Sequence, residues 1–406
     1  MEKRRGRALR GRRRLRAGIV QFLYVLAAFT LGLVVPRIPV GFTVASGRTI
    51  DSLLAAGAGI VTFIGIVYSL LFLVVQFGST TFTPRLNLFR DAPIVWHAFG
   101  FFTGVLVFSF TAAFSIGKDE QTSGLVPIVL VVALVAAIAV FRALQAGAFK
   151  SVQLASTLAQ VTERGREVID DVYPEELRAG AAAPIADAQL SSKGHEVVWP
   201  GVPTVLQVID LPRLARTAEK ANVAIELCAA PGETIFEGTV LGVVHGRTDD
   251  ALDAEILGAL AMGAERTFEQ DPAFALRVLA DIALRALSSA VNDPTTAAQA
   301  LDGLDSLLRR LAGRELAVGP ITDANGNLRV VVNMPTWEEY VGIALDEIII
   351  VGSASLQVRR RLKRLLEDVV ALAPPQRRAA AERRLTQVTA SATGTRPAEL
   401  PGDSMT

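Results

Sequence analysis

The chain has 406 residues, 51% of them apolar, and its 41 basic and 40 acidic residues leave a net charge of +1. This balance excludes a protein that binds polyanions through its overall charge. The single cysteine, Cys228, excludes an intrachain disulfide. The apolar excess over a typical soluble protein is concentrated before residue 142, which predicts an integral membrane protein.

Residues 1–16 form a basic segment with nine Lys and Arg residues, and four long apolar runs follow it. The runs are Ala17–Val35, Ser52–Phe77, Ile94–Ile116 and Leu125–Phe141. Since a helix needs roughly 20 apolar residues to cross a bilayer, we predict a transmembrane bundle of four helices over residues 17–141. The first run is too long for a signal peptide and lacks a small-residue cleavage site, so we interpret it as an uncleaved anchor.

The basic segment also predicts the orientation, because the loops between the runs carry only one or two basic residues each. The N-terminus is expected in the cytoplasm, and four crossings return the chain there. The fold class is therefore a membrane α-helical bundle followed by a cytoplasmic α+β domain. Next to a span, the arginines indicate contact with anionic lipid of the bilayer, and no nucleic-acid partner is expected.

The second run carries small residues four positions apart, Ala55 and Gly59 and then Gly65 and Ser69. This spacing lets helices approach closely, and we favour packing within the bundle over the lining of a pore. No Asp, Glu, Lys or Arg lies in any run, which counts against a proton-coupled transporter. It does not exclude a channel that is gated by an apolar constriction.

The loop 78–91 is expected to carry a short helix at the membrane surface. Thr83 can cap that helix with Pro84 in its first turn, while Arg85 and Arg90 face head groups. Two interpretations stay open: a coupling element between the spans and the cytoplasmic domain, and a simple interfacial turn.

Beyond the spans we predict a helical stalk over 142–174, a linker over 178–194 and a β-rich subdomain over 195–247. The expected elements of this subdomain are strands Val197–Trp199, Thr204–Val208, Val223–Leu227, Thr234–Phe236 and Thr239–Val244, with a helix over Leu211–Lys220. Residues 231–244 resemble half of a biotinyl/lipoyl-type β-hammerhead. They contain no lysine that could carry a cofactor, so no cofactor is predicted.

A mixed subdomain is expected over 248–372, followed by a tail over 373–406 that is largely disordered apart from one short arginine-rich helix. Its elements are helices Ala251–Phe268, Ala273–Leu287, a third helix opened by Asp293 and Pro294, a strand Leu328–Val332, and helices Thr336–Val351 and Ser355–Leu372. The last helix carries a run of five basic residues, which we expect to pair with the acidic side of the helix before it.

The candidate site of this subdomain is a cluster of charged and polar residues around the second and third of these helices. Arg277, Asp281 and Arg285 are four residues apart, so Asp281 can pair with both arginines. Together with Asn292 and Asp293 they could receive an anionic ligand. The structural interpretation, which we favour, is that Asp293 caps a helix and the stripe is an ion-pair ladder.

Four segments in order carry a resemblance to a known family: FTPRLNLFRD, REVIDDVYP, PGETIFEGTVLGVV and ALRVLADIALRALSSAVNDPTTAAQALD. They resemble a family of bacterial predicted integral membrane proteins of unknown function, over residues 17 to 372. Family members commonly have Pro-Gly where this chain has Ser289 and Ala290. The resemblance implies a bacterial inner-membrane protein and transfers no catalytic residue.

The sequence gives no reason to expect an enzyme. It contains no metalloprotease, P-loop or hydrolase motif, and His97, His195 and His245 have no metal-ligand spacing. Two functions remain. One is a homo-oligomeric channel or transporter gated by the cytoplasmic domain. The other is a membrane-anchored sensor or scaffold that binds an anionic ligand or a protein partner in the cytoplasm.

Overall fold

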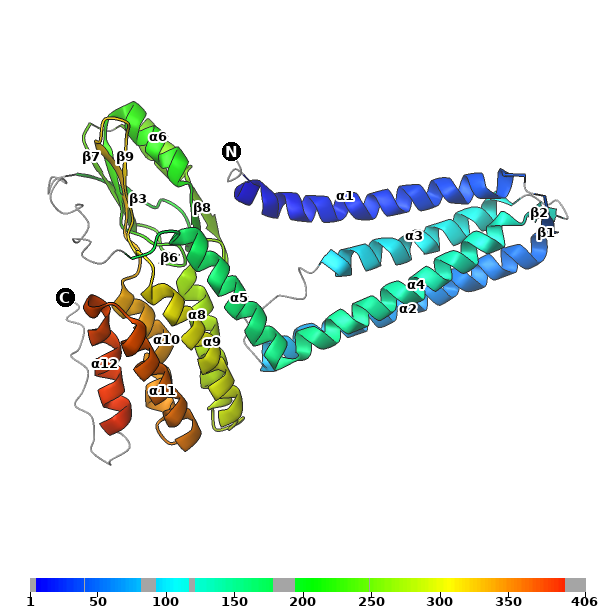
Figure 1. Cartoon of the computed structure of the whole chain (residues 1–406). Coiled ribbons are helices and arrows are strands. Elements are labelled where there is room, and N and C mark those ends of the chain that lie inside the picture. Colours follow the sequence, from blue (N-terminus) through cyan, green and yellow to red (C-terminus); the bar gives the residue numbers. More distant parts are fainter. Residues whose placement is uncertain are drawn as a thin grey trace. The chain divides into compact units, whose positions relative to one another are not determined.

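The computed structural model describes residues 5–39, 41–81, 93–116, 121–177, 194–247 and 249–390. The chain divides into two compact units, Met1–Ser156 and Thr157–Thr406. Each unit is described by itself below (Figure 1).

In its described residues, the first unit consists of four long helices and one pair of short strands that are distant in sequence. The helices are α1 (Arg5–Val34), α2 (Ser46–Thr81), α3 (Pro93–Ser115) and α4 (Leu125–Val152), with a short 3-10 turn η1 (Val35–Arg37) after α1. All four are long and apolar enough to cross a membrane, over Gly18–Arg37, Ser46–Leu73, Ile94–Ser115 and Leu125–Phe149. The four predicted spans are therefore confirmed as candidate spans.

The fourth span is longer than its apolar run suggests. We predicted that it ends at Phe141, whereas the apolar part of α4 reaches Phe149. The sequence after Arg142 is rich in alanine and leucine, which are strong helix formers. The helix continues past Arg142, as we predicted for the stalk, and the candidate span extends further into it than the apolar run.

Helix α3 is the centre of the first unit, since it contacts α1, α2 and α4. Its contact with α1 depends on glycine. A Cβ atom at Gly100 would lie 2.7 Å from Cδ2 of Tyr24, and one at Gly32 would lie 2.7 Å from Cβ of Thr111. Larger residues at these positions would force the two helices apart.

Two strands of three residues each, β1 (Thr43–Ala45) and β2 (Gln121–Ser123), pair antiparallel with Thr43 opposite Ser123. They tie the segment before α2 to the segment before α4. We did not predict them, because three residues are too few to show an alternating pattern.

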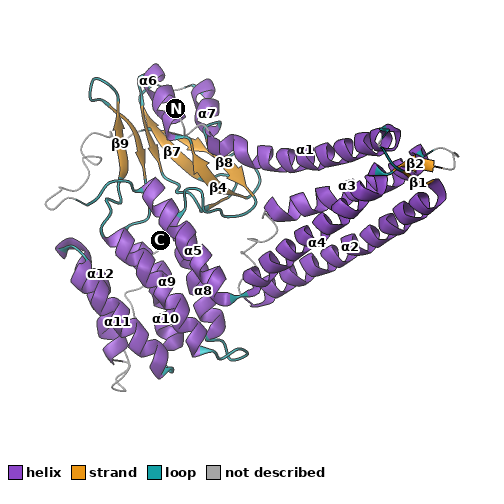
Figure 2. Ribbon diagram, turned by 45° about the vertical axis from the view of Figure 1, so that its right-hand side comes forward, coloured by secondary structure: helices purple, strands orange, loops and turns teal. Residues whose placement is uncertain are grey.

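The second unit contains a β-rich part with two sheets (Figure 2). Its strands are β3 (His195–Val198), β4 (Thr204–Ile209), β5 (Ala224–Leu227), β6 (Thr234–Ile235), β7 (Val240–His245), β8 (Leu260–Gly263), β9 (Val318–Thr322) and β10 (Leu328–Val332). One sheet has the order β3-β7-β5-β10-β9 and the other β6-β4-β8. All pairs are antiparallel except β5 with β10. One apolar core joins the sheets to α6 (Leu211–Ala221) and α7 (Asp250–Leu257).

The helix that we predicted over Ala251–Phe268 is wrong in its second half. Helix α7 ends at Leu257, and β8 follows and pairs with β4, with Leu260 opposite Ile209. Apolar residues over 256–262 fit either a helix or a strand, and pairing across the sheet decides for the strand. Strand β9 was not predicted either.

The rest of the second unit is a bundle of helices. They are α5 (Leu154–Val172), α8 (Pro272–Ala286), α9 (Pro294–Ala312), α10 (Trp337–Gly352), α11 (Leu356–Leu372) and α12 (Pro375–Ala390). The leucine stripe of α9 is completely buried, as its spacing predicts. Helices α8, α9, α10 and α11 start after side-chain caps at Asp271, Asp293, Thr336 and Ser355.

The helix predicted as a stalk is interrupted at Gln153, and its second part, α5, packs into this bundle. A Cβ atom at Gly165 would lie 2.7 Å from Cδ1 of Leu307 and 2.9 Å from Cβ of Ala275. Helix α5 thus approaches α8 and α9 so closely that only glycine fits. Most of the predicted linker, residues 178–193, lies outside the described residues.

The tail that we predicted as largely disordered contains α12, and two of its arginines are buried. Arg377 donates hydrogen bonds to the carbonyl oxygens of Leu311 and Ala312 at the end of α9, at 2.9 and 3.1 Å. Arg384 binds Asp346 of α10. From the sequence alone, the arginines of such a segment are expected to be hydrogen-bonded to water. Here carbonyl and carboxylate oxygens of the protein take the place of that water. Residues 391–406 lie outside the described residues.

The basic run of α11 does not pair with α10 as we expected. Arg361 binds Asp302 and Asp305 of α9 instead. The acidic side of α10 faces α8 and α12, where Glu347 binds Arg277 and Glu338 binds Arg384. The prediction failed because neighbours in sequence need not present their charged faces to each other.

Candidate functional site

The predicted stripe on α8 is an ion-pair cluster that includes a third helix. Nε of Arg277 lies 2.8 Å from Oδ1 of Asp281, and both terminal nitrogens of Arg277 bind the carboxylate of Glu347 on α10. The hydrogen bond from Arg277 lowers the pKa of the Glu347 carboxyl. The guanidinium is therefore already neutralised by two carboxylates.

Arg285, the other arginine of the stripe, stands apart from this cluster. Its side chain is exposed and has no ion pair within the described residues. The predicted pairing of Asp281 with both arginines is thus observed for Arg277 only. The geometry does not bring two free arginines together for an anionic ligand.

Asn292 and Asp293 serve the start of α9. Asp293 accepts hydrogen bonds from the backbone of Thr295 and Thr296, both at 3.1 Å, and from the hydroxyl of Thr296 at 2.6 Å. The Thr296 hydroxyl and these amides lower the pKa of the Asp293 carboxyl. Asn292 has a φ of 48°, a left-handed conformation that asparagine tolerates. The capping role that we favoured is present, and it occupies the carboxylate.

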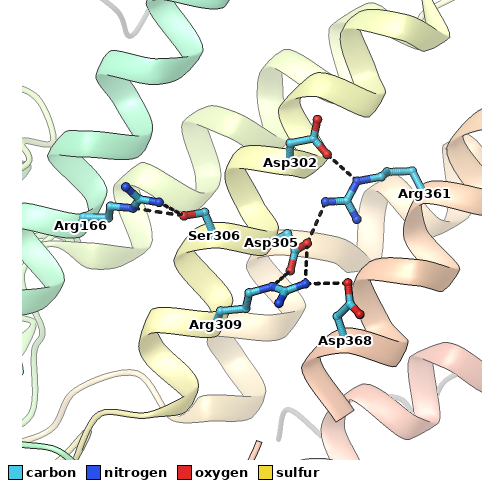
Figure 3. A network of polar contacts seen from close by, with 7 residues as sticks. All are labelled: Arg166, Asp302, Asp305, Ser306, Arg309, Arg361 and Asp368. Carbon is cyan, nitrogen blue, oxygen red and sulfur yellow. Dashed lines mark hydrogen bonds and ion pairs between the residues drawn. The ribbon is translucent and has the colours of Figure 1, made fainter. Parts of the chain in front are cut away.

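A network that we did not predict joins α5, α9 and α11 (Figure 3). Asp305 is its centre, since its carboxylate accepts from Arg309 at 2.6 Å and from Arg361 at 2.8 Å. Arg309 also reaches Asp368 at 2.6 Å, and Arg166 donates to the hydroxyl of Ser306. Asp302, Asp305, Ser306 and Arg309 are three or four residues apart on α9, a spacing visible in the sequence. The network stabilises the packing of these helices against one another.

A buried polar cluster lies at the start of α8. Arg266 donates two hydrogen bonds to Asp271, at 2.8 and 3.0 Å, and Asp271 also caps the backbone of Phe274. Burial raises the pKa of the Asp271 carboxyl against the influence of Arg266. The charge of Asp271 also acts on Tyr173, whose hydroxyl lies 2.8 Å from that of Tyr340. Burial raises the pKa of Tyr173 to about 12. Arg266 with Asp271, and Tyr173 with Tyr340, are each hydrogen-bonded partners, which fits a structural role.

The remaining candidate site residues of the sequence analysis lie in the loop 78–91. Thr83, Arg85 and Arg90 of the loop 78–91 lie outside the described residues. Among the described residues, no group of three or more His, Cys, Asp and Glu side chains could hold a metal ion.

The outward side of α2 is the most distinctive surface of the first unit. Ser52, Ala55, Gly59 and Thr62 are exposed and spaced by three or four residues, so they share one face of the helix. Ser69 continues this face beyond the exposed apolar Ile66, and we call the small and polar residues from Ser52 to Ser69 the α2 stripe. Nothing lies within 4 Å of a Cβ atom placed at Gly59. Packing within the chain's own bundle, which we favoured for these small residues, therefore does not occur at Gly59.

The same holds for Gly65, whose Cβ position is also open, whereas Gly57 on the opposite side packs against Phe110 at 3.4 Å. The neighbouring outward surface of α2 is formed by large apolar residues such as Leu54, Val61 and Phe72. Helix α2 thus has one surface that packs in the bundle, one that is apolar, and one on which small and polar residues predominate, with Ile66 and Leu73 among them.

Four candidate spans, followed by a unit of mixed helices and sheets, define a multi-span membrane protein. The chain belongs to the family described as predicted membrane protein (DUF2254), whose profile matches residues 16–368. Similar proteins include uncharacterized proteins of Mycobacterium bovis and Mycobacterium tuberculosis, each 28% identical over 394 residues, which cover 89% of this chain and 73% of the relative. No solved structure matches the chain significantly.

The contrast between Arg277 and Arg285 gives a direct test of the ion-pair interpretation. Replacing Arg277 by Ala is expected to lower the free energy of unfolding by about 1 kcal/mol, because Glu347 is partly exposed and the pair is weakened by solvent. Arg285→Ala should change it by less than about 0.5 kcal/mol. Chemical denaturation of the full chain in detergent measures both.

The effect of Arg277→Ala should depend on pH. The folded-state pKa of Glu347 lies below its ordinary value of 4.5, so the stabilisation is complete above that pH and is lost as the pH falls through the lowered pKa. The two proteins should therefore converge in strongly acidic solution. If phosphate stabilised the wild type but not Arg277→Ala, the residue would belong to an anion site and this interpretation would fail.

Proposed function

We propose that the protein is the subunit of a homo-oligomeric channel in the bacterial plasma membrane, with the α2 stripe facing other copies and the pore. Both termini and the second unit lie in the cytoplasm in this proposal. Its main support is the α2 stripe, a small and polar face on a membrane-spanning helix that no other part of the described chain covers.

Lipid is a poor neighbour for such a face. Glycine and alanine make few dispersion contacts with acyl chains, whereas they allow a second helix to approach closely. The hydroxyl of Ser52 donates to the carbonyl of Arg48 at 2.9 Å, and that of Thr62 to Ala58 at 3.4 Å. Because their donors are satisfied locally, these residues can line a contact or a pore without unpaired groups.

A pore of this kind needs more than one chain. In the most apolar window of α1, α2 and α4, only 17% of residues are buried within the chain. Helix α3 fills the centre of the bundle, and Phe102 is completely buried there. The chain's own bundle therefore leaves no central path among the described residues, and a conducting path would lie between copies.

The chain's connectivity supports control by the second unit. Only Gln153 separates α4 from α5, and α5 is packed into the helical bundle of the second unit through Gly165. A rearrangement of that bundle would thus act on the fourth span through a single residue. The basic segment of residues 1–16 supports the cytoplasmic placement.

Filling the α2 stripe should disrupt assembly and conduction. Gly59→Leu places a bulky side chain on the proposed contact, so the oligomer is expected to dissociate or its conductance in KCl to fall at least tenfold. Mass measurement in nanodiscs and planar-bilayer recordings under voltage and tension report the two effects. Val61→Leu, on the exposed apolar side of the same helix, is the matched control and should behave as wild type. A monomeric wild-type protein would contradict the proposal.

A second candidate function, a membrane-anchored scaffold, is favoured by one end of the helical bundle. The last turn of α10, the first residue of α11 and the loop after α8 carry exposed large apolar side chains, of which Ile350 is 67% exposed. The others are Val291, Val351 and Leu356. The C-terminal ends of α8 and α10 meet, because a Cβ atom at Gly352 would lie 3.5 Å from Cδ1 of Leu287.

Two exposed arginines flank this apolar end: Arg285 two residues before Leu287, and Arg360 one turn after Leu356. An apolar centre with a basic rim suits an acidic protein surface. A photo-crosslinking residue at Ile350 should then form a discrete protein adduct in cells, and Arg285→Glu with Arg360→Glu should abolish it. The exposed Leu372 in α11 is the control position. An adduct that survives the charge reversal would contradict this function.

A further inference from the structure

A groove on the first unit remains unexplained by either function. It is a cavity of about 810 Å³ between α1, α2 and α3. Its apolar lining consists of Phe22 and Val25 from α1, Leu71 and Phe72 from α2, and Val95 and Phe99 from α3. The volume is in the range of small-molecule sites, roughly 300–1,000 Å³. An apolar lining in a membrane-spanning bundle suits an acyl chain.

Four polar side chains also line the groove: Gln21, Tyr68, Trp96 and Thr103. None of them makes a side-chain hydrogen bond within the part of the chain that the structure describes. Nearby, by contrast, the hydroxyl of Tyr24 lies 3.4 Å from Nδ1 of His97. Unpaired amide, indole and hydroxyl groups are costly in an apolar environment, so a ligand of this groove should carry oxygen atoms that can accept or donate.

The groove lies at one end of the spans. Gly18 and Trp96 lie at or near the beginning of the first and third candidate spans, and Phe72 near the end of the second. Tryptophan at such a position is typical of the membrane–water interface. From Gly18 to Val25 the groove extends about 10 Å along α1, at 1.5 Å per residue, which is about a third of the thickness of a bilayer core.

The charge of the chain at this end is strongly positive. In the sequence, Arg14 and Arg16 precede Gly18 on the same helix, within about 6 Å along the helix axis, and seven more basic residues precede them. An anionic head group at the mouth of the groove would therefore lie near the basic segment. The apolar lining, the unpaired polar groups and this charge match the three parts of an acidic phospholipid: chain, ester region and phosphate.

We propose that this groove binds one anionic phospholipid of the surrounding bilayer. An acyl chain lies between Phe22 and Phe72, the ester region meets Gln21 and Trp96, and the phosphate faces the basic segment. The site is separate from the α2 stripe, so the proposal holds whether or not the protein forms a pore.

Retention of lipid by the purified full chain tests the proposal. After exchange into detergent and addition of phosphatidylglycerol or phosphatidylcholine in equal amounts, native mass spectrometry should show one phosphatidylglycerol per chain, retained at least tenfold over phosphatidylcholine. Gly18→Phe should reduce this retention at least tenfold, because its Cβ position is open and the ring would occupy the groove. Val132→Phe places the same aromatic ring on the exposed surface of α4, away from the groove, and should retain lipid as wild type.

A thermal measurement keeps the test decisive if Gly18→Phe is poorly folded. Phosphatidylglycerol should raise the melting temperature of the wild type, since it binds the folded state, and Gln21→Leu should reduce this rise. Equal retention of both lipids, unchanged retention in Gly18→Phe, or a protein dimer without lipid that Gly18→Phe dissociates would each overturn the proposal.

Discussion

Close approach of helices at glycine is the interaction on which the membrane unit depends. Lipid is as apolar as a leucine side chain, so burial of apolar surface gives helices in a bilayer little reason to associate. Helix α1 meets α3 at Gly32 and Gly100, where any larger residue would collide. The α2 stripe offers the same kind of surface at Gly59 with nothing against it. This contrast carries the proposal that further copies complete the structure.

The second unit is held together by a different means, the neutralisation of arginine between helices. Arg361, Arg377 and Arg384 each lie largely buried, and each is held by carboxylates or by backbone carbonyls from another helix. Buried charges of this kind fix the register of helices more than they add stability. Their consequence for function is that most of the charged residues in this unit are already occupied. Arg285 and Arg360, which are exposed at the apolar end of the bundle, are exceptions.

The sequence was sufficient to predict elements with a strong periodic pattern and a clear cap. The four spans, the leucine stripe of α9 and the caps at Asp271 and Asp293 were predicted because each depends on local spacing. Strand β8 and the buried ion pairs of α12 were missed because pairing across a sheet and contacts with distant helices determine them. For the site, the sequence identified the small residues of α2 and misjudged what they contact. Spacing shows that residues share a face, but it does not show which neighbour covers that face.

The central claim is that the α2 stripe faces another copy of the chain. Disulfide cross-linking in native membranes tests it most directly, in a chain whose only cysteine, Cys228, has been replaced by serine. A cysteine at Gly59 or Thr62 should form a covalent dimer on mild oxidation, whereas one at Val61 should remain monomeric. Equal cross-linking at Val61, or none at Gly59 and Thr62, would contradict the account.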